Sequence, residues 1–248
     1  MIALIDYKAG NLTSVKKALA TIGADLYVPE SPGDLADASG IIVPGVGHFG
    51  ATRALDQSWI DAILARVGEG RPLLGICLGM QWLYEGSDEA PELVGLGLMS
   101  GRCYRLGTVR PDTTEGATGV TKGAAEVRLK SDATKDTDDA TDDTDDARDS
   151  RGVRLQSDRA IKVPHVGWNS LSLERSMSIV EGVPPDAQVY FTHSYAAPIG
   201  SETVAITEHG GPFAAIVQRG HVAGVQFHPE KSGEVGLRIL RNFVELVA

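Results

Sequence analysis

Two short, mostly apolar runs, each ending in a glycine-rich turn, constrain the fold more than any other feature. They are GIIVPGVG at 40–47 and PLLGICLGM at 72–80. Runs of this length without polar alternation are typical of strands buried on both faces of a parallel sheet. Helices are predicted at about 12–22, behind the capping residue Asn11, and at about 57–68. The alternation predicts an α/β fold with a mostly parallel central sheet flanked by helices.

The remaining elements fit the same plan. Strands are predicted at 2–6 and 25–28, and a final helix at about 233–247. Between about 160 and 230 the pattern becomes richer in strands. Because ligands of open α/β sheets bind outside the carboxyl ends of the strands, we expect a site at that edge.

An acidic low-complexity segment interrupts the pattern. Residues 131–150 hold nine Asp against one Lys and one Arg, and they carry most of the net charge of −10. Such a segment has too little apolar surface to offset its ordering entropy. We predict a disordered acidic loop inserted at about 107–158 into one domain that spans 1–248. A cation-binding loop is the alternative, although the glycine and glutamate of an EF-hand loop are missing.

Composition excludes several classes of function. A net charge of −10 and a pI of about 5.0 argue against nucleic acid as the main partner. No apolar stretch approaches the roughly 20 residues of a membrane span, and the N-terminus lacks the pattern of a signal peptide. Two cysteines, Cys77 and Cys103, make neither a disulfide framework nor a four-thiolate zinc site. We therefore expect a cytoplasmic protein without a metal.

The segment Gly75-Ile76-Cys77-Leu78-Gly79 has the pattern of a nucleophile elbow with cysteine in place of serine. The flanking glycines leave room for neighbouring strands. A cysteine at the following helix N-terminus is favoured as a thiolate, and the Leu78 N–H is placed to stabilise an oxyanion. The alternative is a buried structural cysteine at a strand end.

A cysteine nucleophile needs a base and a residue that orients the base. His228 and Glu230 lie two residues apart near the end of the chain, at the carboxyl end of another predicted strand. Residues two apart in an extended segment face the same way, so Glu230 can hold one ring nitrogen while the other faces Cys77. The alternative is a surface histidine beside a solvated glutamate.

Together these motifs resemble the class I glutamine amidotransferases, whose pattern is Gly-x-Cys-x-Gly-x-Gln with a late His-Pro-Glu. The finer pattern is similar to the glutaminase subunits of imidazole glycerol phosphate synthases, from histidine biosynthesis. The matching segments are Asp6-Tyr7, Gly10-Asn11, Pro44–Phe49, Cys77–Gln81, Pro164–Asn169, His193–Tyr195 and Phe227–Ser232.

The resemblance implies a flavodoxin-like fold and a Cys77-His228-Glu230 triad that hydrolyses L-glutamine to glutamate and ammonia. It implies no cofactor. It also implies a cyclase partner, in a 1:1 heterodimer, that receives the ammonia and makes imidazole glycerol phosphate and aminoimidazole carboxamide ribotide.

The resemblance also places the residues that bind glutamine. They are Gly47, Gln81, Glu89, Ser194 and Tyr195. Glutamine is a zwitterion, so Glu89 suits its ammonium group, although a solvated Glu89 is the alternative. Gly45, Val46 and Gly47 match the family's oxyanion strand. Our hypothesis is that a flip of this peptide gates activity. A static turn is the alternative.

A final set matches the surface that faces the cyclase: Pro164, Val166, Trp168, Asn169, Tyr190 and Lys231. We expect the Asn169 amide to bond across this interface. Trp168 as a core residue and Lys231 as a plain surface charge are the alternatives. We also expect that deletion of 112–157 leaves partner-dependent activity largely intact.

Two other functions stay open. One is a triad amidotransferase that serves pyridoxal phosphate, tryptophan or purine synthesis, and the other is a non-catalytic binding module on the same fold. His209 and His221 lie in turn-like segments, and we expect both to be exposed to solvent.

Overall fold

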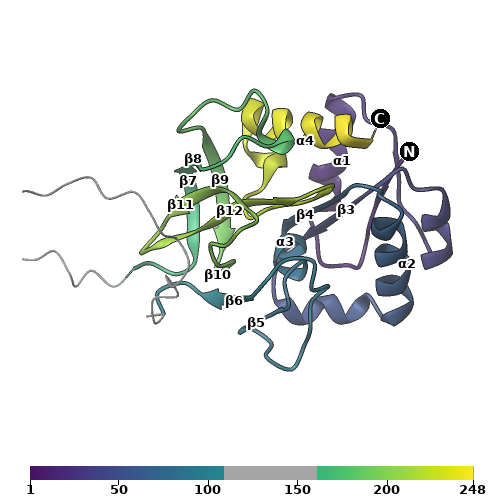
Figure 1. The fold of residues 1–248 in the computed structure, drawn as a ribbon, viewed down its shortest axis with the longest axis horizontal. Coiled ribbons are helices and arrows are strands. Elements are labelled where there is room, and N and C mark those ends of the chain that lie inside the picture. The colour runs from purple at the N-terminus through teal and green to yellow at the C-terminus, as the bar shows by residue number, and fades with distance from the viewer. Residues whose placement is uncertain (109–160, 248) are drawn as a thin grey trace, which may run out of the picture. The chain divides into compact units, whose positions relative to one another are not determined.

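An eight-stranded sheet forms the centre of the fold, in the order β2-β1-β3-β4-β13-β12-β11-β8 (Figure 1). The structure, a computed structural model, describes residues 1–108 and 161–247. The strands of this sheet are β1 (Ile2–Leu4), β2 (Leu26–Tyr27), β3 (Gly40–Gly45), β4 (Leu73–Cys77), β8 (Ser172–Leu173), β11 (Thr203–Glu208), β12 (Pro212–Arg219) and β13 (Val222–Val225).

One half of the sheet is parallel and the other antiparallel. The four pairs from β2 to β13 are parallel, and the three pairs from β13 to β8 are antiparallel. The parallel half has the flavodoxin-like order, with β13 as its fifth strand. The predicted fold class is therefore confirmed, and the later strand-rich region extends the same sheet.

Helices cover both faces of the parallel half. Side chains of β1 and of Ile5, which follows it, alternate between two clusters, with Ile2 and Leu4 in one and Ala3 and Ile5 in the other. The first cluster includes residues of α1 and α4, which lie together in Figure 1, and the second includes residues of α2 and α3. The helices are α1 (Leu12–Thr21), α2 (Gln57–Gly68), α3 (Leu78–Trp82) and α4 (Gly233–Val247).

Local sequence signals account for the helix ends. The Asn11 side chain accepts a hydrogen bond from the Ser14 N–H, which confirms the predicted cap of α1. Asp56 accepts from the backbone N–H groups of Ser58 and Trp59 and caps α2 in the same way. Within residues 1–108 and 161–247 there are also four short 3-10 helices: η1 (Pro32–Asp37), η2 (Phe49–Ala54), η3 (Ser178–Val180) and η4 (Pro229–Lys231).

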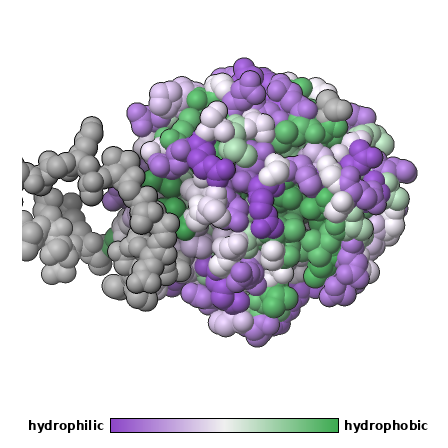
Figure 2. Space-filling model, viewed as in Figure 1, coloured by the Kyte–Doolittle hydropathy of each residue, from purple (hydrophilic) through white to green (hydrophobic). Residues whose placement is uncertain are grey.

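Two smaller sheets accompany the central sheet in the described part of the chain. One is the antiparallel pair β7 (His165–Ser170) and β9 (Gln188–His193). The other has the order β10-β6-β5, formed by Tyr195–Ala196, Arg102–Arg105 and Gly86–Ser87. On the face shown in Figure 2, hydrophobic areas lie between hydrophilic ones, as on most globular surfaces.

The carboxyl ends of three parallel strands bring the chemistry-bearing motifs together. Gly45 at the end of β3 pairs in register with Cys77 at the end of β4, and β13 pairs with β4 up to Val225. The segment after β13 holds His228. Because parallel strands end at one edge, residues 150 positions apart in the chain meet there.

The predicted domain boundaries, 1–248 with an insertion at 107–158, stay predictions. Beyond Thr108 the insertion lies outside the described residues. The cytoplasmic location also stays a prediction. No helix within the described ranges is long and apolar enough to cross a membrane.

Candidate active site

The strand-to-helix turn at Cys77 has the geometry of a nucleophile elbow. Cys77 lies between β4 and α3 with a φ of +53°, in the left-handed region. A Cβ on Gly75 would lie 2.5 Å from the Gly79 carbonyl oxygen, and a Cβ on Gly79 would overlap the Val43 carbonyl oxygen. Only hydrogen fits at both positions. The two glycines therefore allow the tight turn that presents a thiol which is 5% exposed.

His228 and Glu230 form a buried pair behind the thiol. His228 Nδ1 lies 2.9 Å from Glu230 Oε1, and their side chains are 2% and 1% exposed. Burial by itself lowers the pKa of His228, but the Cys77 thiol and the Glu230 carboxylate together raise it to about 9. The other ring nitrogen, Nε2, has no hydrogen-bond partner among the described residues. The carboxylate thus holds one nitrogen and leaves the other for proton transfer.

A cavity of about 300 Å³ opens beside Cys77 and Leu78. Its lining includes every residue that the resemblance assigns to glutamine binding: Gly47, Gln81, Glu89, Ser194 and Tyr195. Three further lining residues were not predicted for the pocket: Pro164, Thr192 and His193. Thr192 and His193 belong to β9. Their position at the cavity depends on the pairing of β9 with β7, which the sequence did not predict.

Glu89 enters the cavity from the segment after β5. Its Oε2 atom accepts a hydrogen bond from the Phe49 backbone N–H at 2.7 Å. This bond fixes the carboxylate at the rim and leaves the other oxygen for a ligand. The pocket therefore offers one anionic group where a ligand's ammonium can sit.

The oxyanion strand holds its central N–H away from the thiol. The Val46 N–H donates to the Ala9 carbonyl oxygen at 2.8 Å. Gly47 has a φ of +91° with open space around its Cα, whereas a Cβ on Gly45 would overlap the Tyr7 hydroxyl. The Tyr7 hydroxyl is buried and has no hydrogen-bond partner in the described part of the chain. In this state the Val46 N–H cannot serve an oxyanion at Cys77.

Gln226 is a site residue that sequence reasoning missed. It is fully buried, and its Nε2 atom lies 3.6 Å from the Cys77 sulfur. Its Oε1 atom accepts a hydrogen bond from Gln81 Nε2 at 3.1 Å. The available signal was its spacing, because Gln226 lies two residues before His228 in an extended segment and so faces the same way.

The predicted partner-facing residues divide between two faces of the β7–β9 pair. Val166 and Trp168 are 54% and 57% exposed. Trp168 packs edge-on against Tyr190 with ring centroids 6.0 Å apart, and Lys231 Nζ lies 5.8 Å from the Tyr190 ring centroid. These residues form one outward surface, which we call the Trp168 surface. The exposed Pro164 lies next to it and also lines the cavity.

The Asn169 amide makes hydrogen bonds within the chain, and the bond expected across an interface stays a prediction. Its Nδ2 atom lies 3.2 Å from His165 Nε2 and donates to the Glu208 carbonyl oxygen at 3.0 Å. Its Oδ1 atom accepts from the Ser170 N–H. Because Asn169 alternates with Trp168 along β7, its side chain turns inward.

His209 and His221 are also less exposed than predicted. His209 Nε2 bonds the Lys162 carbonyl oxygen at 2.7 Å, and His221 Nε2 bonds the Val67 carbonyl oxygen at 2.8 Å. Both rings are half-buried. No group of three or more His, Cys, Asp or Glu side chains within 1–108 and 161–247 is arranged to hold a metal ion.

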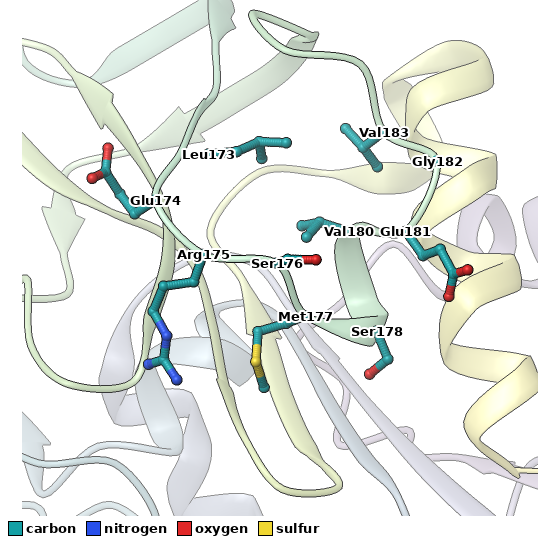
Figure 3. Close-up of a pocket in the computed structure, with 10 residues that line it drawn as sticks. All are labelled: Leu173, Glu174, Arg175, Ser176, Met177, Ser178, Val180, Glu181, Gly182 and Val183. Carbon is teal, nitrogen blue, oxygen red and sulfur yellow. The ribbon is translucent and has the colours of Figure 1, made fainter.

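A second hollow, of about 730 Å³, is lined by residues between Leu173 and Val183 and by none of the proposed catalytic or glutamine-binding residues (Figure 3). The chain from Leu173 to Val183 curves around it, with Glu181 and Gly182 beside α4. Cys77, His228 and Glu89 do not line it. The candidate active site is therefore the smaller cavity at the carboxyl edge of the sheet.

A cysteine at a nucleophile elbow, with a buried histidine–glutamate pair behind it, defines a triad enzyme with a thiol nucleophile on a parallel α/β sheet. A family model described as "Glutamine amidotransferase class-I" matches residues 3–247. The chain belongs to this family, and within it to the relatives named imidazole glycerol phosphate synthase subunit HisH. The resemblance predicted from the motifs is confirmed.

Two of these relatives show the extent of the similarity. The HisH subunit of Moorella thermoacetica is 38% identical over 250 residues, covering 99% of this chain and 95% of the relative. The HisH subunit of Methanothermobacter thermautotrophicus is 35% identical over 248 residues, covering 100% and 99%.

Two solved structures share the fold. One is described as "Crystal structure of glutamine amidotransferase", with a TM-score of 0.62, 19% identity, and coverage of 100% of this chain and 99% of that chain. The other, "Structure of PurLQS from Thermotoga maritima", has a TM-score of 0.63, 15% identity, and coverage of 100% and 98%.

Proposed function

We propose that this chain is the glutaminase subunit of an imidazole glycerol phosphate synthase. It hydrolyses glutamine to glutamate and ammonia, and it passes the ammonia to a cyclase subunit. The observation that carries the proposal is the His228–Glu230 pair, held at 2.9 Å behind Cys77 at a cavity lined by all five expected glutamine-binding residues.

The triad accounts for the chemistry in two steps. The Cys77 sulfur attacks the side-chain amide carbon of glutamine, and His228 carries the thiol proton to the leaving ammonia. This leaves a thioester between Cys77 and the glutamyl group. His228 then takes a proton from water as the water attacks the thioester, glutamate leaves, and the proton returns to the sulfur. Glu230 keeps the imidazole oriented throughout.

The pocket suits the zwitterionic end of glutamine. Glu89 holds the ammonium group, and Gln81 and the Ser194–Tyr195 segment also line the cavity. Leu78 N–H supplies one oxyanion donor. The second donor comes from the strand of Gly45, Val46 and Gly47 once its peptide has turned.

The bond between Val46 and Ala9 explains how such a subunit stays quiet alone. While the Val46 N–H donates to Ala9, the oxyanion lacks one donor. One missing oxyanion donor typically costs a factor of about 10²–10³ in rate. We propose that docking of the cyclase with its own ligand favours the turned peptide.

The Trp168 surface is the proposed docking site for the cyclase, in a 1:1 heterodimer. It presents exposed apolar and aromatic side chains, which are common at interface centres, with the charged Lys231 beside them. It also adjoins the cavity, through Pro164 and Thr192. Ammonia released at Cys77 then has a short way to the partner. The products of the partner would be imidazole glycerol phosphate and aminoimidazole carboxamide ribotide.

The test is glutamate release from glutamine by the full chain alone, with the cyclase subunit, and with that subunit plus its nucleotide ligand. We expect near silence alone, strong activity in the full mixture, and no activity with Cys77→Ala. Full activity of the chain alone would instead indicate an uncoupled glutaminase or an amidotransferase that serves another synthase. No activity in any mixture would favour a binding module.

A further inference from the structure

Two buried histidines face each other at the glutamine pocket, and one of them, His193, lines it. His165 begins β7 and His193 ends β9, and the two are direct partners in the antiparallel register. They are 4% and 7% exposed. His165 Nδ1 lies 3.1 Å from His193 Nε2.

The neighbours of the pair fix the position of each hydrogen. His193 Nδ1 lies 2.9 Å from the Tyr195 carbonyl oxygen, which can only accept, so Nδ1 carries the hydrogen. In a neutral ring, Nε2 of His193 then accepts a hydrogen bond from His165 Nδ1. His165 Nε2 in turn accepts from the Asn169 amide at 3.2 Å.

Both rings are neutral at physiological pH. Burial lowers the pKa of His165 to about 4 and the pKa of His193 to about 3. Repulsion between positive charges acts in the same direction. His209 lowers the pKa of His165, and His209 and His228 lower the pKa of His193. With both rings neutral, each group in the series donates to the next: Asn169 to His165, His165 to His193, and His193 to the Tyr195 carbonyl oxygen.

That carbonyl connects the histidines to the pocket. The Tyr195 oxygen also accepts from Gln81 Nε2 at 2.8 Å, and Gln81 donates to Gln226. Gln226 in turn donates toward the Cys77 sulfur at 3.6 Å. Unbroken hydrogen bonds thus run from β7 through the histidine pair to the nucleophile.

The end of these hydrogen bonds that is far from Cys77, at Asn169 and His165, lies on the strand that carries the proposed docking surface. His165 and Asn169 occupy the inner face of β7, whereas Val166 and Trp168, which alternate with them, are exposed on the outer face. A shift of β7 therefore moves the His165–His193 bond directly.

We propose that His165 and His193 are positioning residues for glutamine: as a neutral hydrogen-bonded pair they hold the Tyr195 carbonyl and the Gln81 amide in place, and Asn169 ties them to the docking strand. This inference rests on the proposed function, because it concerns the same pocket. It adds residues that touch neither the reacting carbon nor the thiol.

A packing role alone is the competing explanation. His165 stacks on Phe191 with ring centroids 4.7 Å apart and on His209 at 4.1 Å. Asparagine and leucine have nearly the same shape, but only asparagine carries an amide that can replace the Nδ1 donor. A packing role predicts equal effects for His165→Asn and His165→Leu. A positioning role predicts that asparagine rescues and leucine does not.

The experiment measures inactivation of the full chain by a diazoketone analogue of glutamine, which alkylates the thiol that attacks it. This readout separates the half-saturating concentration from the limiting rate and requires no cyclase. We expect His165→Leu to raise the half-saturating concentration about tenfold with a smaller change in limiting rate, and His165→Asn to stay within about threefold of the wild type. His209→Leu, which keeps the pair's hydrogen bonds, should behave as the wild type.

His193 provides a second matched pair in case His165→Leu does not fold. His193→Asn keeps a donor for the Tyr195 carbonyl and should bind the analogue better than His193→Leu. Equal half-saturating concentrations for leucine and asparagine at both positions would overturn the inference and leave the proposed function standing. A wild-type chain that fails to react with the analogue both alone and in the complex with the cyclase and its ligand would overturn both.

Discussion

The side-chain amide of Gln226, a fully buried residue, lies 3.6 Å from the Cys77 sulfur and donates toward it. The two residues are 149 positions apart in the chain. They meet because β13 and β4 are parallel neighbours, with Val225 in register with Ile76. A neutral donor at this position stabilises a thiolate without adding a charge that would compete with His228.

Replacement of Gln226 by methionine tests this contact. Methionine has a similar shape but offers no amide, so Cys77 loses a donor and Gln81 loses an acceptor. We expect kcat for glutamine hydrolysis in the cyclase complex to fall about tenfold. Gln218→Met is the matched control: Gln218 is 3% exposed and donates to Ser178 and Gly220, away from the cavity. The control should lower the free energy of unfolding and leave kcat unchanged. A kcat that falls as much in the control would contradict the role.

The raised pKa of His228 predicts a pH dependence of stability. The raised pKa of about 9 means that the folded chain holds the His228 proton up to about pH 9, whereas the unfolded chain releases it near the ordinary histidine pKa of 6.5. The folded state therefore binds more protons in this window, and the stabilisation is present below pH 6.5 and lost as pH rises toward 9. Urea unfolding at several pH values should show a falling free energy of unfolding. Glu230→Gln should make the free energy of unfolding depend less on pH. An unchanged dependence would contradict the role of Glu230 in raising the pKa of His228.

Gly45→Ala tests the gating of the oxyanion strand. The added Cβ would overlap the Tyr7 hydroxyl and approach Leu78 Cβ to 2.8 Å, so the Gly45–Val46 peptide loses its freedom to turn. We expect stimulation by the cyclase and its ligand to drop by a factor of about 10²–10³, with little change in the activity of the chain alone. Gly33→Ala is the control, because its Cβ would meet only Ser31 Oγ, at 3.7 Å. Unchanged stimulation in Gly45→Ala, with a normal melting temperature, would argue for a static strand.

Local signals in the sequence were sufficient to predict the helices and the parallel strands. The bounds predicted for 57–68 and 233–247 match α2 and α4, because capping residues and apolar periodicity are local. The elbow glycines could also be read locally. The triad and the glutamine-binding residues were placed from motifs, and the cavity brings the glutamine-binding residues together.

The missed features depend on contacts between distant segments. The bonds of Asn169 to His165 and to the Glu208 carbonyl oxygen were not predicted, and they depend on how β7 pairs and packs. The bond from Val46 to Ala9 joins two loops whose approach is set by the neighbouring strands β1 and β3. Periodicity carries no information about such pairings, because it reports burial and not the identity of the neighbour.

The Trp168 surface gives the last prediction. Trp168 is 57% exposed, so its removal costs little folding energy, yet a tryptophan at an interface centre carries a large share of binding energy. We expect Trp168→Ala to weaken the complex with the cyclase at least about tenfold, because hot-spot truncations typically cost 2 kcal/mol or more. Its melting temperature should stay close to that of the wild type. Ile199→Ala is the matched control, since Ile199 is 48% exposed and lies outside this surface. Affinity measured by titration calorimetry should fall for Trp168→Ala alone, and equal affinities for the two variants would move the docking site elsewhere.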